Sequence, residues 1–80
     1  MSEEEILIEI KKVLTEDFEV DDDIIRPEAS FYDDLGLDSL DAIDLIVTMN
    51  NVFNIDVENK DIENTQTIKQ LIRVVKNNLK

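Results

Sequence analysis

The sequence predicts an all-α protein: a small bundle of three main helices plus one short helix, with a long packed loop between the first and second main helices. Three segments carry apolar residues at helical spacing, and each follows a polar residue that suits a helix N-cap. No segment shows the alternation of a half-buried strand, and the single glycine and the single proline fall outside the three segments. A chain of 80 residues has room for a modest core, so residues 1–80 are expected to form one domain.

The first helix is predicted over residues 3 to 17. Ser2 and Glu5 form the S-x-x-E pattern of a capping box at its start. Ile8 lies off the apolar stripe of this segment, so its side chain is expected to be exposed. The stripe itself consists of Ile6, Leu7, Ile10, Val13 and Leu14.

Residues 18 to 37 form a long connection. Pro27 disfavours helix at the residue before it, and Gly36 marks a candidate position for positive φ. A loop of this length is uncommon, and it usually serves a function or packs through its own side chains. Packing is favoured here by seven spaced apolar residues: Phe18, Val20, Ile24, Ile25, Phe31, Leu35 and Leu37.

The second helix is predicted over residues 39 to 53, with Asp38 as its N-cap and Asp41 three residues on. It has two apolar faces. The broad one holds Leu45, Ile46, Met49, Val52 and Phe53, and the opposite one holds Leu40, Ile43 and Val47. The second face is either a contact surface, the rim of a cavity, or a surface that the long loop covers.

The remaining elements are a short helix around residues 58 to 63, with Ile62 pointing inward, and a last helix over about residues 67 to 79. Thr67 and Gln70 repeat the capping pattern at the start of the last helix. Its apolar stripe consists of Ile68, Leu71, Ile72, Val75 and Leu79. Bases on its solvent flank suit the negative end of the helix dipole.

Composition excludes several kinds of chemistry. The chain has no histidine and no cysteine, which rules out thiol chemistry, imidazole catalysis and the usual zinc sites. A net charge of -12 makes nucleic acid and anionic membrane poor partners and a basic protein surface a natural one. The N-terminus is acidic and has no long apolar run, so a cytoplasmic protein without stable membrane insertion is expected.

The segment DDLGLDSLDAIDL, residues 33 to 45, holds one serine among five aspartates. If Asp38 caps the second helix, Ser39 is the first residue of that helix, where unpaired N–H groups and the helix dipole favour an anion. A phosphate ester on Ser39 would be stabilised there. No base is available to activate the hydroxyl, so a separate, basic enzyme is expected to supply the chemistry.

These residues closely resemble the 4'-phosphopantetheine attachment site of acyl carrier proteins. The family pattern, roughly F-x-x-D-L-G-x-D-S-L-[DE], is met at Phe31, Asp34, Leu35, Gly36, Asp38, Ser39, Leu40 and Asp41. The likeness extends over nearly the whole chain, including Pro27-x-Ala29-x-Phe31, the Phe53 that ends the second helix, and Thr67-x-x-x-Leu71.

The resemblance implies a function. Ser39 would receive 4'-phosphopantetheine from coenzyme A through a basic-surfaced carrier protein synthase, and the thiol of the arm would hold acyl groups as thioesters. A monomer is expected to present them to acyl-transfer and condensing enzymes. The positions that match the partner-facing residues of the family are Asp38, Leu40, Asp41, Ile43, Asp44 and Val47. The candidates for the lining of an acyl pocket are Phe31, Leu45, Ile46 and Ile62.

The sequence departs from the pattern at four positions. Many carriers of fatty acid synthesis have three acids just before the phenylalanine that ends the second helix, where this chain has Asn50, Asn51 and Val52. Glu58 stands where the family usually has a proline. The resemblance therefore leaves two pathways open, fatty acid biosynthesis and a specialised lipid or polyketide-type pathway with its own enzymes.

Other function classes fit the same residues less well. A calcium-binding EF-hand loop fails, because placing Gly36 at its sixth position puts Phe31 first, Leu35 fifth and Ala42 twelfth. No metal site is predicted, although the acids can bind divalent cations loosely. An enzyme is disfavoured, since no base of suitable pKa stands near a nucleophile. The remaining alternative is an unmodified acidic helical interaction domain that docks through its second apolar face.

Overall fold

The computed structural model describes residues 1–58 and 65–79 of the chain. Within these residues it contains α1 (Glu3–Asp17), the short 3-10 helix η1 (Asp22–Ile24), α2 (Ser39–Phe53) and α4 (Ile68–Asn78). The three main helices lie where the sequence predicts them, and no β-strand is formed in the described ranges, so the predicted all-α class is confirmed. The short helix predicted around residues 58 to 63, with its inward-pointing Ile62, falls outside the described residues except for Glu58.

Each of the three α-helices begins with a capping box. In α1 the Glu5 N–H donates to Ser2 Oγ at 3.2 Å, and the Ser2 N–H donates to Glu5 Oε1 at 2.9 Å. Thr67 and Gln70 form the same reciprocal pair at the start of α4. These bonds satisfy backbone donors that a helix start otherwise leaves unpaired, which is why the polar residues in the sequence locate the helix starts so closely.

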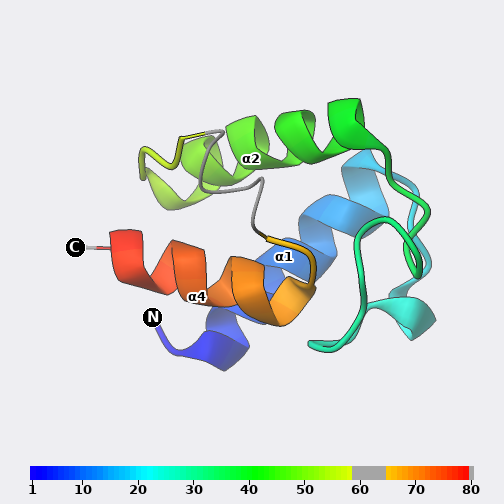
Figure 1. Cartoon of the computed structure of the whole chain (residues 1–80). Helices are drawn as coiled ribbons and strands as arrows, with labels where there is room; N and C mark the ends of the chain where they lie inside the picture. Colours follow the sequence, from blue (N-terminus) through cyan, green and yellow to red (C-terminus); the bar gives the residue numbers. More distant parts are fainter. Residues whose placement is uncertain (59–64, 80) are drawn as a thin grey trace.

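The core lies where the three helices meet. Helix α1 packs against both α2 and α4, and it runs behind α4 in the view of Figure 1. Ile8 is exposed, as expected. Val52 differs from the expectation, because its side chain is 44% exposed. It stands at the edge of the broad apolar face, on the flank that also carries Thr48, where the neighbouring helices no longer cover it.

The loop between α1 and α2 is packed rather than loose. Val20, Ile25, Ala29, Phe31, Leu35 and Leu37 are all buried in it, whereas Ile24 remains exposed. The loop is also joined to the start of α4 through a single antiparallel bridge between Ser30 and Thr67. The Phe31 N–H donates to the Gln66 carbonyl at 2.9 Å, and the Ile68 N–H donates to the Ala29 carbonyl at 3.1 Å. The loop that precedes α2 is therefore fixed to a distant part of the chain.

Candidate functional site

Ser39 is the first residue of α2 and is exposed. Asp38 precedes it as the N-cap: the Asp41 N–H donates to Asp38 Oδ1 at 2.9 Å, and the Asp38 N–H donates to Asp41 Oδ2 at 3.3 Å. The Ala42 N–H donates to the Asp38 carbonyl at 3.0 Å. Among the described residues, none accepts a hydrogen bond from the N–H groups of Ser39 and Leu40. Two donors at the positive end of the helix are thus available to an anion beside Ser39.

The loop just before Ser39 is held to the core by two buried leucines and a backbone hydrogen bond. Leu35 and Leu37 are buried, and the Leu37 N–H donates to the carbonyl of Phe31 at 2.9 Å. Between them Gly36 has a φ of +70°, a conformation that a residue with a side chain rarely adopts. The chain therefore turns sharply around Gly36 and enters α2 with Ser39 on the outside.

The second apolar face of α2 is open to solvent. Leu40 is 72% exposed, Val47 53% and Ile43 39%, so the loop over residues 18–37 does not cover these side chains. Asp38 and Asp44 are exposed beside them, and Asp41 is half-buried. The six predicted partner-facing residues thus lie at the N-cap of α2 and along the helix as far as Val47, and all of them except Asp41 are exposed.

A groove lies beside the start of α2, between this helix and the end of α1. Its volume is about 480 Å³, and it is lined by Asp17, Phe18, Glu19, Leu37, Asp41, Asp44 and Thr48. Four of these seven residues are acids, so the groove favours a positively charged group. No group of three or more potential metal-binding side chains is brought together in the described part of the chain.

The family of the chain follows from comparison with known proteins. A family model described as "Phosphopantetheine attachment site" matches residues 9–75. The chain belongs to this family. It is also similar to the crystal structure of an acyl carrier protein from Thermotoga maritima, with 26% sequence identity and a TM-score of 0.87, over 98% of this chain and 91% of that one.

Family and fold together are those of an acyl carrier protein, as the sequence predicts. The carrier is not an enzyme, and its cofactor is covalently attached 4'-phosphopantetheine. Such carriers interact with synthases and acyl-transferring enzymes. None of the carrier's helices within residues 1–58 and 65–79 has both the length and the hydrophobicity to cross a bilayer.

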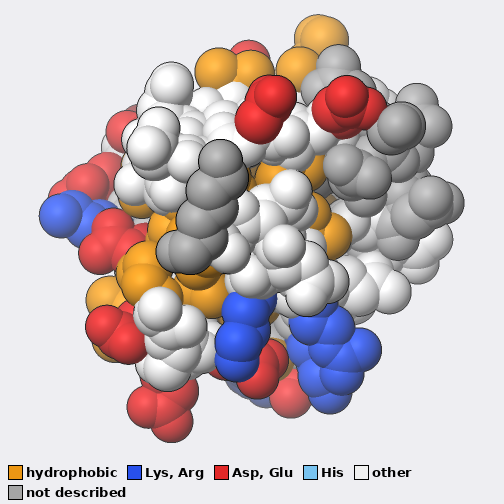
Figure 2. Space-filling view, turned by 90° about the vertical axis from the view of Figure 1, so that its left-hand side faces the viewer, with side chains coloured by type: hydrophobic (Ala, Val, Ile, Leu, Met, Phe, Trp, Pro, Cys, Tyr) orange, Lys and Arg blue, Asp and Glu red, His pale blue; other side chains and the backbone are white. Residues whose placement is uncertain are grey.

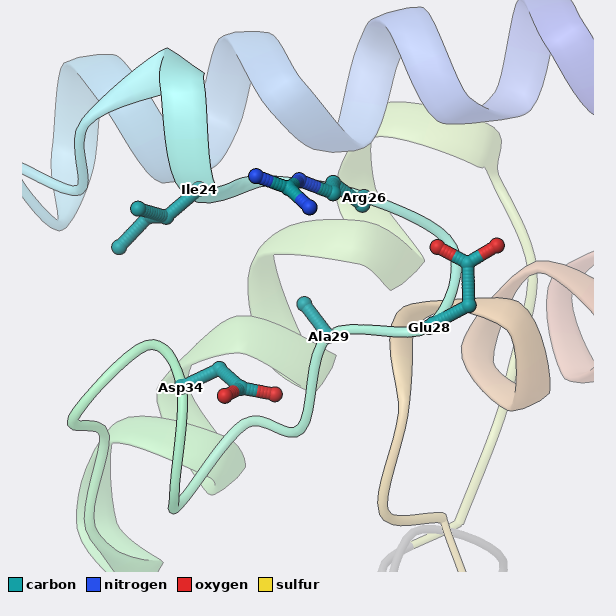
Figure 3. Close-up of a pocket in the computed structure, with 5 residues that line it drawn as sticks. All are labelled: Ile24, Arg26, Glu28, Ala29 and Asp34. Atoms are coloured by element: carbon teal, nitrogen blue, oxygen red, sulfur yellow. The ribbon is translucent and has the colours of Figure 1, made fainter.

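The acyl-pocket candidates of the carrier lie in the core. Phe31, Leu45 and Ile46 are almost completely buried in one apolar cluster, while Ile62 lies outside the described residues. A second hollow, of about 270 Å³, opens elsewhere, in the loop between α1 and α2 (Figure 3). It is lined by Ile24, Arg26, Glu28, Ala29 and Asp34. Neither hollow is lined by the three buried candidates.

Sequence reasoning missed the role of Asn50. This side chain is half-buried and grips the backbone of Val57 on both sides: Asn50 Nδ2 donates to the Val57 carbonyl at 3.1 Å, and the Val57 N–H donates to Asn50 Oδ1 at 2.9 Å. Asn50 therefore fixes the segment that follows α2 in the carrier. No local sequence pattern predicts these bonds, because Val57 lies seven residues after Asn50 in irregular backbone.

Proposed function

We propose that Ser39 carries the 4'-phosphopantetheine arm and that this chain presents acyl groups to partner enzymes. The observation that supports Ser39 most strongly is the comparison of the three serines of the chain. Ser2 Oγ accepts the Glu5 N–H and Ser30 Oγ accepts the Asp33 N–H, so both hydroxyls serve the local backbone. Ser39 is exposed, and its hydroxyl has no hydrogen bond to any described residue.

The start of α2 fits a phosphodiester. In the attachment reaction a bond forms between Ser39 Oγ and the pantetheine-bearing phosphorus of coenzyme A, and the pyrophosphate bond breaks, so the nucleotide part leaves. The hydroxyl proton goes to a base of the synthase, because this chain has no histidine or cysteine and no base beside Ser39. The N–H groups of Ser39 and Leu40 and the helix dipole then stabilise the phosphodiester charge. The bound arm supplies a thiol that carries the acyl group as a thioester.

We assign partner docking to the exposed side of α2, with Leu40, Ile43 and Val47 as the apolar contacts. Asp38, Asp41 and Asp44 add negative charge around them, and the acidic groove extends it toward the end of α1. This combination suits the basic surface of a carrier protein synthase and of acyl-transfer or condensing enzymes. Docking of this kind is transient and steered by charge, which agrees with a carrier that acts as a monomer in the cytoplasm and visits several enzymes.

The pathway is either fatty acid biosynthesis or a specialised lipid or polyketide-type pathway, and the second half of α2 favours the specialised one. Asn51 is neutral and Val52 apolar where many carriers of fatty acid synthesis have acids, and the amide of Asn50 is occupied by Val57. A partner enzyme whose basic residues contact the whole length of α2 would meet negative charge only along the first half of this helix. Enzymes with a matching neutral contact region are the expected partners.

Incubation of the purified chain with coenzyme A, Mg²⁺ and a broad-specificity carrier protein synthase tests the proposal. Intact-mass spectrometry should show the gain of one phosphopantetheine group, and peptide mapping should place it on Ser39. Ser39→Ala should gain nothing, whereas Ser2→Ala, the matched control at another helix start, should be modified normally. Wild-type protein that stays unmodified would instead support the alternative, an acidic interaction domain without an arm.

A further inference from the structure

Asp34 closes a tight turn five residues before Ser39. Its carboxylate Oδ2 accepts the Ser30 N–H at 2.7 Å, a short charge-assisted hydrogen bond. In return the Ser30 carbonyl accepts the N–H groups of Asp34 at 3.0 Å and of Leu35 at 3.1 Å. Figure 3 shows the Asp34 carboxylate reaching across the turn toward the chain that follows Ala29. Residues 30–35 thus form a closed loop whose two sides are bonded in both directions.

The bridge to α4 explains why Ser30 needs this carboxylate. At the bridge, the backbone groups that pair with the α4 side belong to the flanking residues, the Ala29 carbonyl and the Phe31 N–H. The N–H and carbonyl of Ser30 therefore point the other way, into the turn. An unpaired N–H in a half-buried residue is costly, and Asp34 satisfies it.

The turn is linked to Ser39 by a short, bonded path. Leu35 is buried at the end of the turn, Gly36 reverses the chain, and the Leu37 N–H is bonded to the Phe31 carbonyl inside the turn. Asp38 then caps α2 directly before Ser39. A change in the closure of the turn therefore shifts or loosens the residues that hold the start of α2.

We propose that Asp34 is a positioning residue for the modification of Ser39, and that its carboxylate acts through the turn in addition to the negative charge that it shares with Asp33. This inference rests on the proposed attachment to Ser39. Asp33 provides the comparison, since it is the adjacent exposed acid and its side chain makes no hydrogen bond or ion pair with any described residue. Asp33 and Asp34 contribute equal charge, but only Asp34 closes the turn.

Three substitutions separate the closure of the turn by Asp34 from the contribution of its negative charge to docking. Asp34→Glu keeps the charge but lengthens the side chain, which spoils the short bond to the Ser30 N–H. Asp34→Asn removes the charge but keeps an oxygen at the same distance. Asp33→Asn is the matched control that removes the same charge from the neighbouring residue. kcat and KM for transfer of phosphopantetheine from coenzyme A are measured for each variant with one broad-specificity synthase, and the Ser30 amide is followed by NMR.

The expected result is a split between the kinetic constants. Asp34→Glu should lower kcat about fivefold with little change in KM. The lost bond to the Ser30 N–H contributes about 1 kcal/mol, and without it the turn no longer holds the Ser39 hydroxyl in place after docking. Its Ser30 amide signal should shift and exchange faster with solvent. Asp34→Asn and Asp33→Asn should both keep kcat and raise KM by the same small factor, as expected for the loss of one docking charge.

Two outcomes would overturn the inference: a wild-type kcat for Asp34→Glu, or equal reductions of kcat in Asp34→Asn and Asp33→Asn. Both would mean that Asp34 contributes only charge. Wild-type protein that is not modified at all would refute the attachment to Ser39 instead. The shift of the Ser30 amide in Asp34→Glu would then still report whether Asp34 holds the turn, so the two failures are distinguishable.

Discussion

Gly36 is the residue at which backbone conformation most directly decides the position of Ser39. Its φ is +70°, yet a Cβ built there would meet no atom within 4 Å. Gly36→Ala should therefore cost only the backbone strain of a left-handed residue, about 1 kcal/mol of unfolding free energy. Asparagine tolerates this conformation better than alanine, so Gly36→Asn should cost less.

Urea denaturation of the three proteins, followed by far-UV circular dichroism, measures the difference. An equal loss of stability in Gly36→Ala and Gly36→Asn would show that the left-handed conformation is not the cause. A loss of several kcal/mol in both would point to a steric clash that the open space around Gly36 does not contain.

The predictability of individual residues depends on whether their reason is local in the sequence. Ser39 and Gly36 stand out because cap, serine and glycine fall within one short motif. Asn50 and Asp34 did not stand out for their hydrogen bonds, because those bonds join irregular backbone whose course depends on the whole fold. In the sequence Asp34 is one of five aspartates around Ser39 and a position of the family pattern, and its bond to Ser30 becomes visible only once the bridge to α4 is in place.

At the scale of the helix, one side of α2 packs into the core and stabilises the fold, and the other side is assigned to docking. Leu45 is buried in the core, whereas Leu40 is the most exposed large apolar residue of the described chain. Leu45→Ala should lower the unfolding free energy by about 3 kcal/mol, and Leu40→Ala should leave it within about 0.5 kcal/mol.

Both variants are compared by thermal denaturation and by synthase kinetics. Leu40→Ala should raise the KM for the carrier while its melting temperature stays close to that of the wild type. If Leu40→Ala instead lost stability and kept its KM, the second face of α2 would be part of the fold and not a docking surface.

The capping box of α1 gives a pH-dependent contribution to stability. The backbone N–H of Ser2, followed by its hydroxyl, holds the pKa of Glu5 below its ordinary value of 4.5. Because the folded pKa is lowered, this contribution is fully present above the ordinary pKa and is lost as the pH falls through the folded value. Glu5→Gln keeps a capping oxygen without a titrating group.

Melting temperatures of the wild type and Glu5→Gln between pH 3 and pH 7 test this expectation. The advantage of the wild type over the variant should be largest near pH 7 and should shrink on acidification below the ordinary pKa of Glu5. A difference between the two proteins that stays constant with pH would show that the Glu5 carboxylate is not stabilised by folding.

The helices were predictable because three capping boxes mark their starts and an apolar face that packs into the core runs along each of them. The path of the long loop was not. Its spaced apolar residues indicate packing, but η1 and the bridge between Ser30 and Thr67 arise from contacts between segments far apart in the chain. Val52 shows the limit of a helical wheel, since the wheel gives direction but not how far the neighbouring elements extend.

For the molecule as a whole, the net charge of -12 links stability and docking through the same side chains. On the face shown in Figure 2, acidic side chains are spread widely and basic ones stand at fewer places among them. Few ion pairs offset the repulsion in the described part of the chain: Lys11 Nζ lies 3.4 Å from Asp22 Oδ1, and Lys76 Nζ lies 3.9 Å from Glu3 Oε2. Lys11 is half-buried, and the other three residues are exposed. Pairs of this kind contribute little. The acids around α2 therefore repel one another in the folded protein and attract a basic partner in solution.

Added salt should raise the stability of the folded protein and weaken its docking to a basic partner. Screening of the repulsion should raise the melting temperature of the unmodified protein, by roughly 4–8 °C for each kcal/mol relieved, and millimolar Mg²⁺ should act at lower concentration than NaCl. The same screening should lower kcat/KM for modification by the synthase, because attraction of the acidic face to a basic surface speeds encounter. Calorimetry and kinetics in one salt series make the comparison. A melting temperature unmoved by either salt would mean that repulsion between the acids does not destabilise the fold. A kcat/KM that rises with the salt concentration would mean that the acids around Ser39 do not attract the partner.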